Sequence, residues 1–213
     1  MPDLPNPWLE IPAADYEGHM GSPEVGQLQL LNQLLARAVA ATRPECAAVL
    51  GVAAGNGLEH FDPTVTQRIL GVDLNPAYLE LARRRFPALA GRLELLCADL
   101  DAWDPAPSQF DLVSAALIFE YVNAARLLRQ IRRALTPTGV LAVVLQLPSP
   151  GLPSVSKTRY ASLEKLAPLF RHYTRAEFLA LASAAGLVEQ AGEVIPLPSG
   201  KEFYFGSFVL PQR

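Results

Sequence analysis

The stretch Val49-Leu50-Gly51-Val52-Ala53-Ala54-Gly55-Asn56-Gly57 joins an apolar run to a glycine-rich turn. A second short apolar run, residues 68–72, ends at the acidic Asp73. Glycines at a strand-to-helix turn let the backbone approach a ligand closely, because a Cβ atom would block it. An acid at the end of the next parallel strand accepts hydrogen bonds from both hydroxyls of a ribose. The pattern therefore predicts a nucleotide-binding α/β unit.

The rest of the chain alternates strand-like and helix-like segments. Apolar runs predict strands at residues 47–52, 68–72, 93–97, 110–115 and 140–146. Apolar residues at helical spacing predict helices at residues 22–41, 76–86, 124–135 and 175–185. Two final strands, residues 187–195 and 202–210, are predicted to form a hairpin. This alternation favours a parallel, doubly wound sheet with right-handed crossovers.

Local signals set several of these boundaries. Ser22-Pro23 has the form of an N-cap followed by proline, so the first helix is expected to begin there. Thr174 and Glu177 form a capping-box sequence at the start of the last helix. Residues 136–139, Thr-Pro-Thr-Gly, are predicted to be a turn before the fifth strand.

Composition limits the kinds of partner. The chain has 213 residues, half of them hydrophobic, which suits one α/β domain with a full core. The net charge is −3 without a block of basic residues, so no nucleic acid is expected as main partner. The two cysteines give no disulfide framework. The N-terminus does not resemble a signal peptide and no apolar run has membrane-spanning length, so a cytoplasmic monomer or homodimer without membrane contact is expected.

Two common nucleotide-binding patterns fit the glycine-rich turn poorly. The nicotinamide fingerprint G-x-G-x-x-G needs a third glycine, but His60 stands at that position after Gly55 and Gly57. Pro63 also interrupts the following helix early. A phosphate-binding P-loop needs lysine followed by serine or threonine, and no such pair follows the glycines.

The order of motifs resembles that of class I S-adenosylmethionine-dependent methyltransferases over about residues 49–210. Their first motif, acid-x-Gly-x-Gly-x-Gly, falls here on Gly51, Ala53, Gly55 and Gly57. The last two glycines match, alanine replaces the first, and the acid that helps to hold the methionine amino group is missing. The resemblance implies a Rossmann-like doubly wound seven-stranded sheet, mostly parallel with an antiparallel C-terminal hairpin strand.

The resemblance also assigns residues to the binding of S-adenosyl-L-methionine. Asp73, with Leu74 beside it, matches the acid that binds the ribose after the second strand. Asp99 matches the acid that takes the adenine amino group after the third strand, with Leu100 beside the ring. Ala115, near the end of the fourth strand, is assigned to the same site together with the positions of the first motif.

The chain is then expected to form one methyltransferase domain of four parts, residues 1–213. Residues 1–45 form an N-terminal lid segment and helix, and residues 46–147 form the cofactor-binding core. Residues 148–173 form a substrate-side insertion, since a connection of this length is often functional. Residues 174–213 form a C-terminal helix and hairpin.

Candidate catalytic residues follow from the segments that reach the carboxyl ends of the strands. Before the first helix, Tyr16 is a candidate for bonding the cofactor carboxylate and His19 for a base, while an ordinary surface turn is the alternative. After the fourth strand, Glu120 is the first choice for a base or substrate anchor, with Tyr121 beside it. A carboxylate placed at a helix start for its dipole is the alternative for Glu120.

A third segment begins at Gln146 and continues into the insertion, which contains Arg159. A cationic residue there would hold a substrate carboxylate, while a solvated loop is the alternative. The histidines His19, His60 and His172 lack metal-ligand spacing, so no metal is predicted.

Together these features predict methyl transfer from S-adenosyl-L-methionine to an unidentified small-molecule acceptor. Methyl transfer from a sulfonium is an in-line displacement, so the protein must align the acceptor in a dry pocket. Two alternatives are a non-catalytic S-adenosylmethionine-binding module, which the altered first motif favours, and a nicotinamide-linked oxidoreductase.

Overall fold

The computed structural model describes residues 6–211, and its core is a seven-stranded sheet of order β3-β2-β1-β4-β5-β7-β6. The strands are β1 Cys46–Leu50, β2 Arg68–Asp73, β3 Leu93–Cys97, β4 Phe110–Ala116, β5 Leu135–Gln146, β6 Val188–Pro196 and β7 Glu202–Val209. Neighbouring strands from β3 to β5 are parallel, and β7 is antiparallel to β5 and to β6. The predicted Rossmann-like fold, mostly parallel with an antiparallel hairpin strand, is confirmed.

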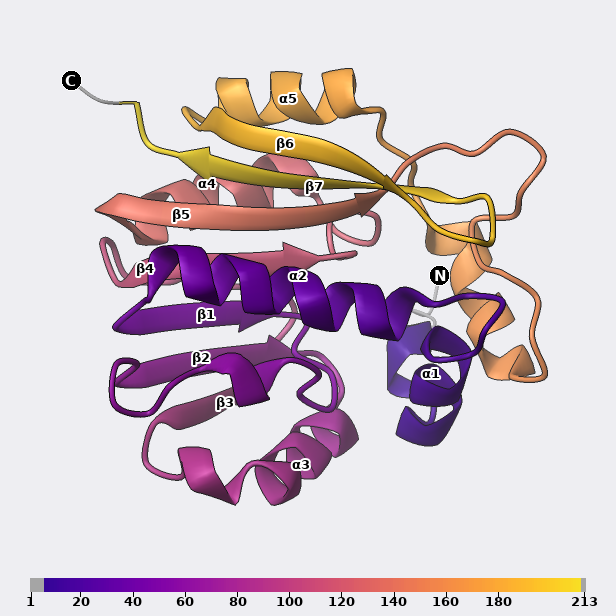
Figure 1. The fold of residues 1–213 in the computed structure, drawn as a ribbon, viewed down its shortest axis with the longest axis horizontal. Coiled ribbons are helices and arrows are strands. Elements are labelled where there is room, and N and C mark those ends of the chain that lie inside the picture. The colour runs from indigo at the N-terminus through magenta and orange to yellow at the C-terminus, as the bar shows by residue number, and fades with distance from the viewer. Residues whose placement is uncertain (1–5, 212–213) are drawn as a thin grey trace.

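Helices cover both faces of the sheet, and Figure 1 shows α2 in front of it and α4 behind it. The α-helices are α1 Ala13–Met20, α2 Gln27–Thr42, α3 Pro76–Arg85, α4 Ala124–Ala134 and α5 Arg175–Ala184. The 3₁₀ helices are η1 Pro7–Leu9, η2 Leu58–His60, η3 Pro87–Leu89 and η4 Ala161–Leu169. Within residues 6–211, no helix combines the length and the apolar character needed to cross a membrane.

The apolar runs read from the sequence are buried on both faces. In β1, Ala47 and Val49 pack with α2, whereas Ala48 and Leu50 belong to the core under α4. Successive strand residues point to opposite faces, so a strand covered by helices on both sides must be apolar throughout. This requirement explains why β1 has no polar alternation.

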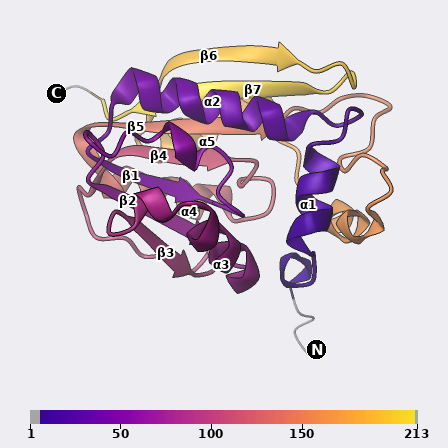
Figure 2. The same cartoon turned by 60° about the horizontal axis from the view of Figure 1, so that its bottom comes forward.

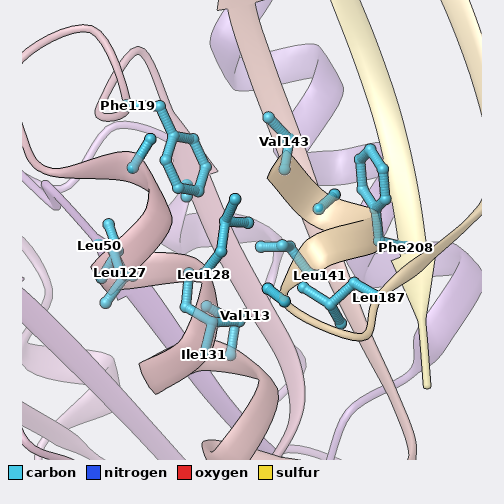
Figure 3. Packing of buried hydrophobic residues seen from close by; sticks show 14 of the residues in the cluster. Leu50, Val113, Phe119, Leu127, Leu128, Ile131, Leu141, Val143, Leu187 and Phe208 are labelled. Atoms are coloured by element: carbon cyan, nitrogen blue, oxygen red, sulfur yellow. The ribbon is translucent and has the colours of Figure 1, made fainter. Parts of the chain in front are cut away.

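The larger core lies under α4 and α5. Figure 3 shows Leu128 and Ile131 of α4 close to Val113 of β4, and these three side chains are fully buried. Leu127, Leu128 and Ile131 recur at helical spacing, which turns one face of α4 to the sheet. The sheet and this helix are thereby fixed against each other along β4.

The predicted helix start at Ser22-Pro23 is wrong, because residues 13–20 already form α1 and α2 begins at Gln27. The Ser22 hydroxyl donates to the carbonyl oxygen of His19 at 2.9 Å, so Ser22 belongs to the turn that follows α1. The chain then turns at Gly26, whose φ of 63° is left-handed, before α2 begins. The segment expected as a lid or a surface turn is therefore a helix.

The predicted turn at residues 136–139 is also wrong, because β5 begins at Leu135. Leu135 pairs with Phe110 and Val140 pairs with Leu112, so residues 136–139 form an irregularity within the strand pairing. The sequence Thr-Pro-Thr-Gly is compatible with this irregular segment of a strand as well as with a turn. The capping box at the start of α5 is confirmed.

The parallel strands point toward α1 and the segment 148–173, which lie together at one end of the sheet in both views (Figures 1 and 2). The Tyr78 hydroxyl of α3 donates to the carbonyl oxygen of Ile11 at 3.0 Å. The Asn75 side chain donates to the carbonyl oxygen of Trp8, also at 3.0 Å. These bonds hold the N-terminal segment over the strand ends, while the roles given to the four parts of the chain stay predictions.

Phe178 of α5 provides a test of the core. It is fully buried, with its ring centroid 4.8 Å from that of Phe119 and 5.7 Å from that of Phe208. Phe178→Ala is expected to lower the free energy of unfolding by about 3–5 kcal/mol in urea titrations, because it removes a ring and leaves a cavity. Leu169→Ala, at a position 42% exposed, is the control. If both variants lost the same free energy of unfolding, the placement of Phe178 in the core would be wrong.

Candidate active site

The order of strands reverses between β1 and β4, which are neighbours at the centre of the sheet. Such a switch point leaves a crevice outside the carboxyl ends of the strands. A cavity with about 1180 Å³ of space between atoms, part of it open to solvent, lies at this point. Residues that follow β1, β2 and β4 line one side, and residues of α1 and of the segment 148–173 line the other.

Asp73 is the last residue of β2 and lines this cavity. Its Oδ2 accepts the backbone N–H of Ala53 at 2.8 Å, and its Oδ1 accepts that of Asn75 at 2.9 Å. Burial raises the pKa of Asp73, and the backbone N–H groups oppose this rise. Each carboxylate oxygen has further lone-pair capacity, so the group can still accept bonds from hydroxyls of a ligand.

Two positions of the glycine-rich motif lie at the cavity. Gly51 and Ala53 line it, and both have left-handed backbone, with φ of 69° and 47°. A Cβ atom on Gly51 would collide with the tip of the Ile118 side chain, so the acid of the motif that the sequence resembles would require Ile118 to move. Ala53 holds a conformation that costs an L-residue free energy and that glycine adopts readily, which accounts for the glycine that the first motif has at this position.

Gly55 and Gly57 do not line the cavity. A Cβ atom on Gly55 would collide with the ring of Phe86, and one on Gly57 would press against Leu35 of α2. The structure therefore places these two predicted cofactor residues where the loop packs on the domain. Their contribution to a ligand site is to set the path of the loop.

The loop after β3 supplies a second acid. Asp99 is exposed and lines the cavity together with Leu74 and Leu100, and its Oδ1 accepts the N–H of Asp101 at 2.8 Å. These three predicted residues are thus brought together with Asp73. Ala115 differs, because it is fully buried in the core under α4 and is not part of the lining.

Three more of the predicted residues line the cavity, namely Tyr16 and His19 of α1 and Tyr121 of the loop after β4. Nδ1 of His19 lies 2.9 Å from Oγ1 of Thr158 in the insertion, and the residue is 4% exposed. Burial, and then the charge of Lys201, lower the pKa of His19 below its ordinary value. The ring is therefore neutral at pH 7 and able to accept a proton.

Glu120 does not line the cavity, so its prediction as the first choice for a base requires correction. Its side chain is fully buried, with Oε1 accepting the N–H of Gln146 at 2.9 Å. Its Oε2 has no hydrogen-bond partner among residues 6–211. Burial raises the pKa of Glu120 to about 8, so the carboxyl is mostly protonated at neutral pH. It is a buried neutral acid under the end of β5.

Aromatic rings form much of the wall between α1 and the insertion. The ring centroid of Trp8 lies 6.0 Å from that of Tyr16 and 5.1 Å from that of Tyr121. Phe170 lies 5.4 Å from Tyr121, and Tyr78 lies 5.7 Å from Tyr16. The sequence pointed to Tyr16 and Tyr121, whereas the other three come from distant segments and have no local signal.

The cationic residue at the cavity is not the one suggested by the insertion. Arg159 is exposed, lies over the ring of Tyr160 and does not line the cavity. Lys201, at the turn before β7, lines it together with the predicted Gln146. A lone lysine beside a hairpin turn has no sequence signal. Among residues 6–211, no three His, Cys, Asp or Glu side chains gather in a way that could hold a metal ion.

Comparisons with known proteins agree with this architecture. Residues 49–139 match the family model of a methyltransferase domain. A trans-aconitate 2-methyltransferase from Methylobacterium radiotolerans is 36% identical over 113 residues, which are 52% of this chain and 41% of the relative. One from Paracidovorax citrulli is 37% identical over 78 residues, 36% of this chain and 28% of the relative. The match therefore spans less than half the length of these curated relatives.

Solved structures share the fold at low identity. An S-adenosylmethionine-dependent methyltransferase from Mesorhizobium loti has a TM-score of 0.66 at 21% identity, covering 90% of this chain and 99% of its own. The N-methyltransferase NodS from Bradyrhizobium japonicum, in complex with S-adenosyl-L-homocysteine, has a TM-score of 0.67 at 16% identity, covering 87% of this chain and 88% of its own. The [4+2]-cyclase SpnF has a TM-score of 0.68 at 16% identity, covering 86% of this chain and 82% of its own.

The switch-point cavity, the antiparallel β7 and the matched domain agree with the class I S-adenosylmethionine-dependent methyltransferase fold. Residues 49–139 match a methyltransferase domain, and an S-adenosylmethionine-dependent methyltransferase shares the fold, which supports the family predicted from the sequence.

Glu120 allows a test through pH. A pKa raised from 4.5 to about 8 means that the folded chain keeps a proton that the unfolded chain has lost. Stability therefore falls as pH rises from about 4.5 to 8. Glu120→Gln is uncharged throughout, so we expect a flatter pH dependence and a free energy of unfolding higher than wild type at pH 8 by a few kcal/mol.

Urea titrations at pH 5 and pH 8 measure this effect. Glu24→Gln is the control, because Glu24 is exposed in the turn before α2. If wild type and Glu120→Gln lost stability equally between the two pH values, the raised pKa would be wrong.

Proposed function

We propose that the chain binds S-adenosyl-L-methionine and transfers its methyl group to a small-molecule acceptor. The observation that carries this proposal is the Asp73 carboxylate, which ends β2 beside the switch point and lines the cavity. An acid at this place binds ribose hydroxyls in nucleotide-binding α/β folds. The matched methyltransferase domain includes the same residue.

The residues at the cavity suit this cofactor. Asp73 would accept the ribose hydroxyls with the lone pairs that its two backbone donors leave. Asp99 would accept the adenine amino group, with Leu74 and Leu100 beside the ring. At Gly51 the bare backbone forms the cavity wall, so a ligand can approach the main chain closely.

The bound cofactor would supply a methyl group on a positively charged sulfur, and loss of the methyl group leaves a neutral thioether. The chain therefore needs no acid for the leaving group. Trp8, Tyr16 and Tyr121 offer aromatic faces that favour a positive charge and displace water from the cavity. Their further role would be to align the acceptor for an in-line displacement.

The segments that cover the cavity, α1 and residues 148–173, are packed closely together, which favours a small acceptor. The Ser162 hydroxyl of η4 donates to Asp15 of α1 at 2.6 Å, so the insertion and α1 are joined above the strand ends. Gly18 of α1 faces the ring of Tyr160 so closely that a Cβ atom there would collide with it. The curated relatives are named for trans-aconitate, which is also a small molecule.

The cofactor assignment is tested by calorimetric titration with S-adenosylmethionine, S-adenosylhomocysteine and NADH in parallel. We expect the wild type to bind the first two and not NADH. Asp73→Asn is expected to weaken binding of S-adenosylhomocysteine roughly tenfold to a hundredfold, because a hydrogen bond to a charged acceptor contributes about 1.5–3 kcal/mol.

Asp62→Asn is the matched control for Asp73→Asn. Asp62 also accepts the backbone N–H two residues on, that of Thr64 at 2.8 Å, but it is exposed and lies outside the lining. Equal affinity in the wild type and both variants would contradict the ribose site. Binding of NADH alone would favour an oxidoreductase instead.

His19 is the residue that we propose as a base for an oxygen or nitrogen acceptor, with Tyr121 beside the acceptor. With an acceptor found in a methylation screen, His19→Asn is expected to lower turnover roughly a hundredfold. Its affinity for S-adenosylhomocysteine should stay within about twofold of wild type, because a base acts only in the chemical step. His60→Asn is the control, since His60 bonds to Asn32 at 2.8 Å outside the lining. Unchanged turnover in His19→Asn would exclude it as the base.

A further inference from the structure

Lys201 is a buried cation in the wall of the cavity. It immediately precedes β7, and only 3% of its surface is exposed. The other lysines differ, because Lys157 is exposed outside the lining and Lys165 pairs with Glu10. Lysine is almost never fully buried without a partner, because removing its charge from water is costly.

The hydrogen-bond partners of Lys201 within the chain are neutral. Its Nζ donates to the carbonyl oxygen of Ser154 at 2.8 Å and lies 3.4 Å from Oε1 of Gln146. Among residues 6–211, no carboxylate oxygen lies within 4.0 Å of this Nζ. Burial lowers the pKa of Lys201 to about 8, which leaves the ammonium mostly protonated at pH 7. An ammonium has three donors, so one donor remains for a ligand.

The titratable groups around Lys201 do not supply the missing negative charge. Glu120 bonds to the backbone N–H of Gln146, and its own pKa of about 8 keeps it mostly protonated at neutral pH. The charge of Lys201 helps to lower the pKa of both His19 and His172, so these rings face it as neutral groups. The positive charge at this end of the cavity is uncompensated.

Further donors lie at the same place. Nε2 of Gln27 lies 3.4 Å from Oε1 of Gln146, and Gln27 lines the cavity. Gln27 is also the first residue of α2, a helix of 16 residues whose N-terminus carries a partial positive charge. Together with the ammonium, these groups favour an anion.

This anion is not expected to be the carboxylate of the cofactor. Asp73 ends β2, whereas Lys201 precedes β7, and the strands β1, β4 and β5 lie between them. Four strand spacings correspond to roughly 19 Å. The carboxylate of the methionyl group is only a few bonds from the ribose, so a ribose at Asp73 would leave it well short of Lys201.

We propose that Lys201 binds a carboxylate group of the methyl acceptor. The proposal rests on the methyltransferase function proposed above and names the chemical class of its acceptor as a small carboxylate. One ammonium with neutral donors matches the single negative charge of one carboxylate group, whereas one phosphate monoester group carries about two negative charges at neutral pH.

The test uses the full chain saturated with S-adenosylhomocysteine. Benzoate, succinate and trans-aconitate are titrated calorimetrically, with benzamide, succinamide and inorganic phosphate as comparisons. We expect at least one carboxylate to bind roughly tenfold or more tightly than its amide and than phosphate, because only the carboxylate pairs with a single ammonium. This comparison needs no variant, so it does not depend on the folding of one.

Lys201→Met keeps the length of the side chain and removes its charge. It is expected to weaken binding of the preferred carboxylate roughly tenfold to a hundredfold while S-adenosylhomocysteine affinity stays within about twofold. Lys157→Met is the matched control, since it removes the same charge from an exposed position of the insertion. Its carboxylate affinity should equal that of the wild type.

The outcomes separate this inference from the function on which it rests. Failure of the wild type to bind S-adenosylhomocysteine would overturn the methyltransferase proposal itself. Normal cofactor binding without any preference for carboxylates, or with tighter binding of phosphate, would overturn the role of Lys201 alone. A Lys201→Met variant that lost S-adenosylhomocysteine but kept the carboxylate would assign the lysine to the cofactor and also overturn it.

Discussion

The carboxylate of Asp73 joins the two loops on which the cavity depends. Through its two backbone hydrogen bonds it holds the turn after β1 against the start of α3. Strand β2 pairs with one edge of β1, and β4 pairs with the opposite edge of β1. The crevice at this reversal is therefore fixed by the same group that we propose to bind the ribose. A carboxylate serves both purposes, because it accepts several hydrogen bonds at once.

The cover of the cavity comes from segments that have no role in the sheet. The N-terminal segment is held on α3 by Tyr78 and Asn75, and α1 is joined to η4 through Asp15 and Ser162. Rings from these segments meet those of the central domain, so an aromatic wall forms where chain ends and insertions converge. This arrangement encloses a volume that the sheet alone would leave open to water, which suits a displacement reaction at a cationic sulfur.

Charge is distributed unevenly along the cavity. Asp73 and Asp99 lie at the ends of β2 and β3, whereas Lys201 lies near the end of β5 on the other side of the switch point. Glu120 adds no charge at neutral pH, because burial keeps its carboxyl mostly protonated. The acid of the first motif is also missing from this region, and Ile118 occupies the position that a side chain on Gly51 would need. One end of the cavity is thus acidic and the other basic.

The sequence by itself determined the class of fold and the end of the cavity that we propose for the cofactor. Apolar runs, N-caps and strand-end acids are local signals, so they located the strands, the capping box at Thr174 and the acids Asp73 and Asp99. Only the tertiary structure decided the end that we propose for the acceptor. Lys201 and the rings of Trp8, Tyr78 and Phe170 come from distant segments, and their meeting depends on how the termini and the insertion pack. It also decided that Glu120 is buried and neutral, because burial and protonation are properties of the surroundings of a residue and not of its type.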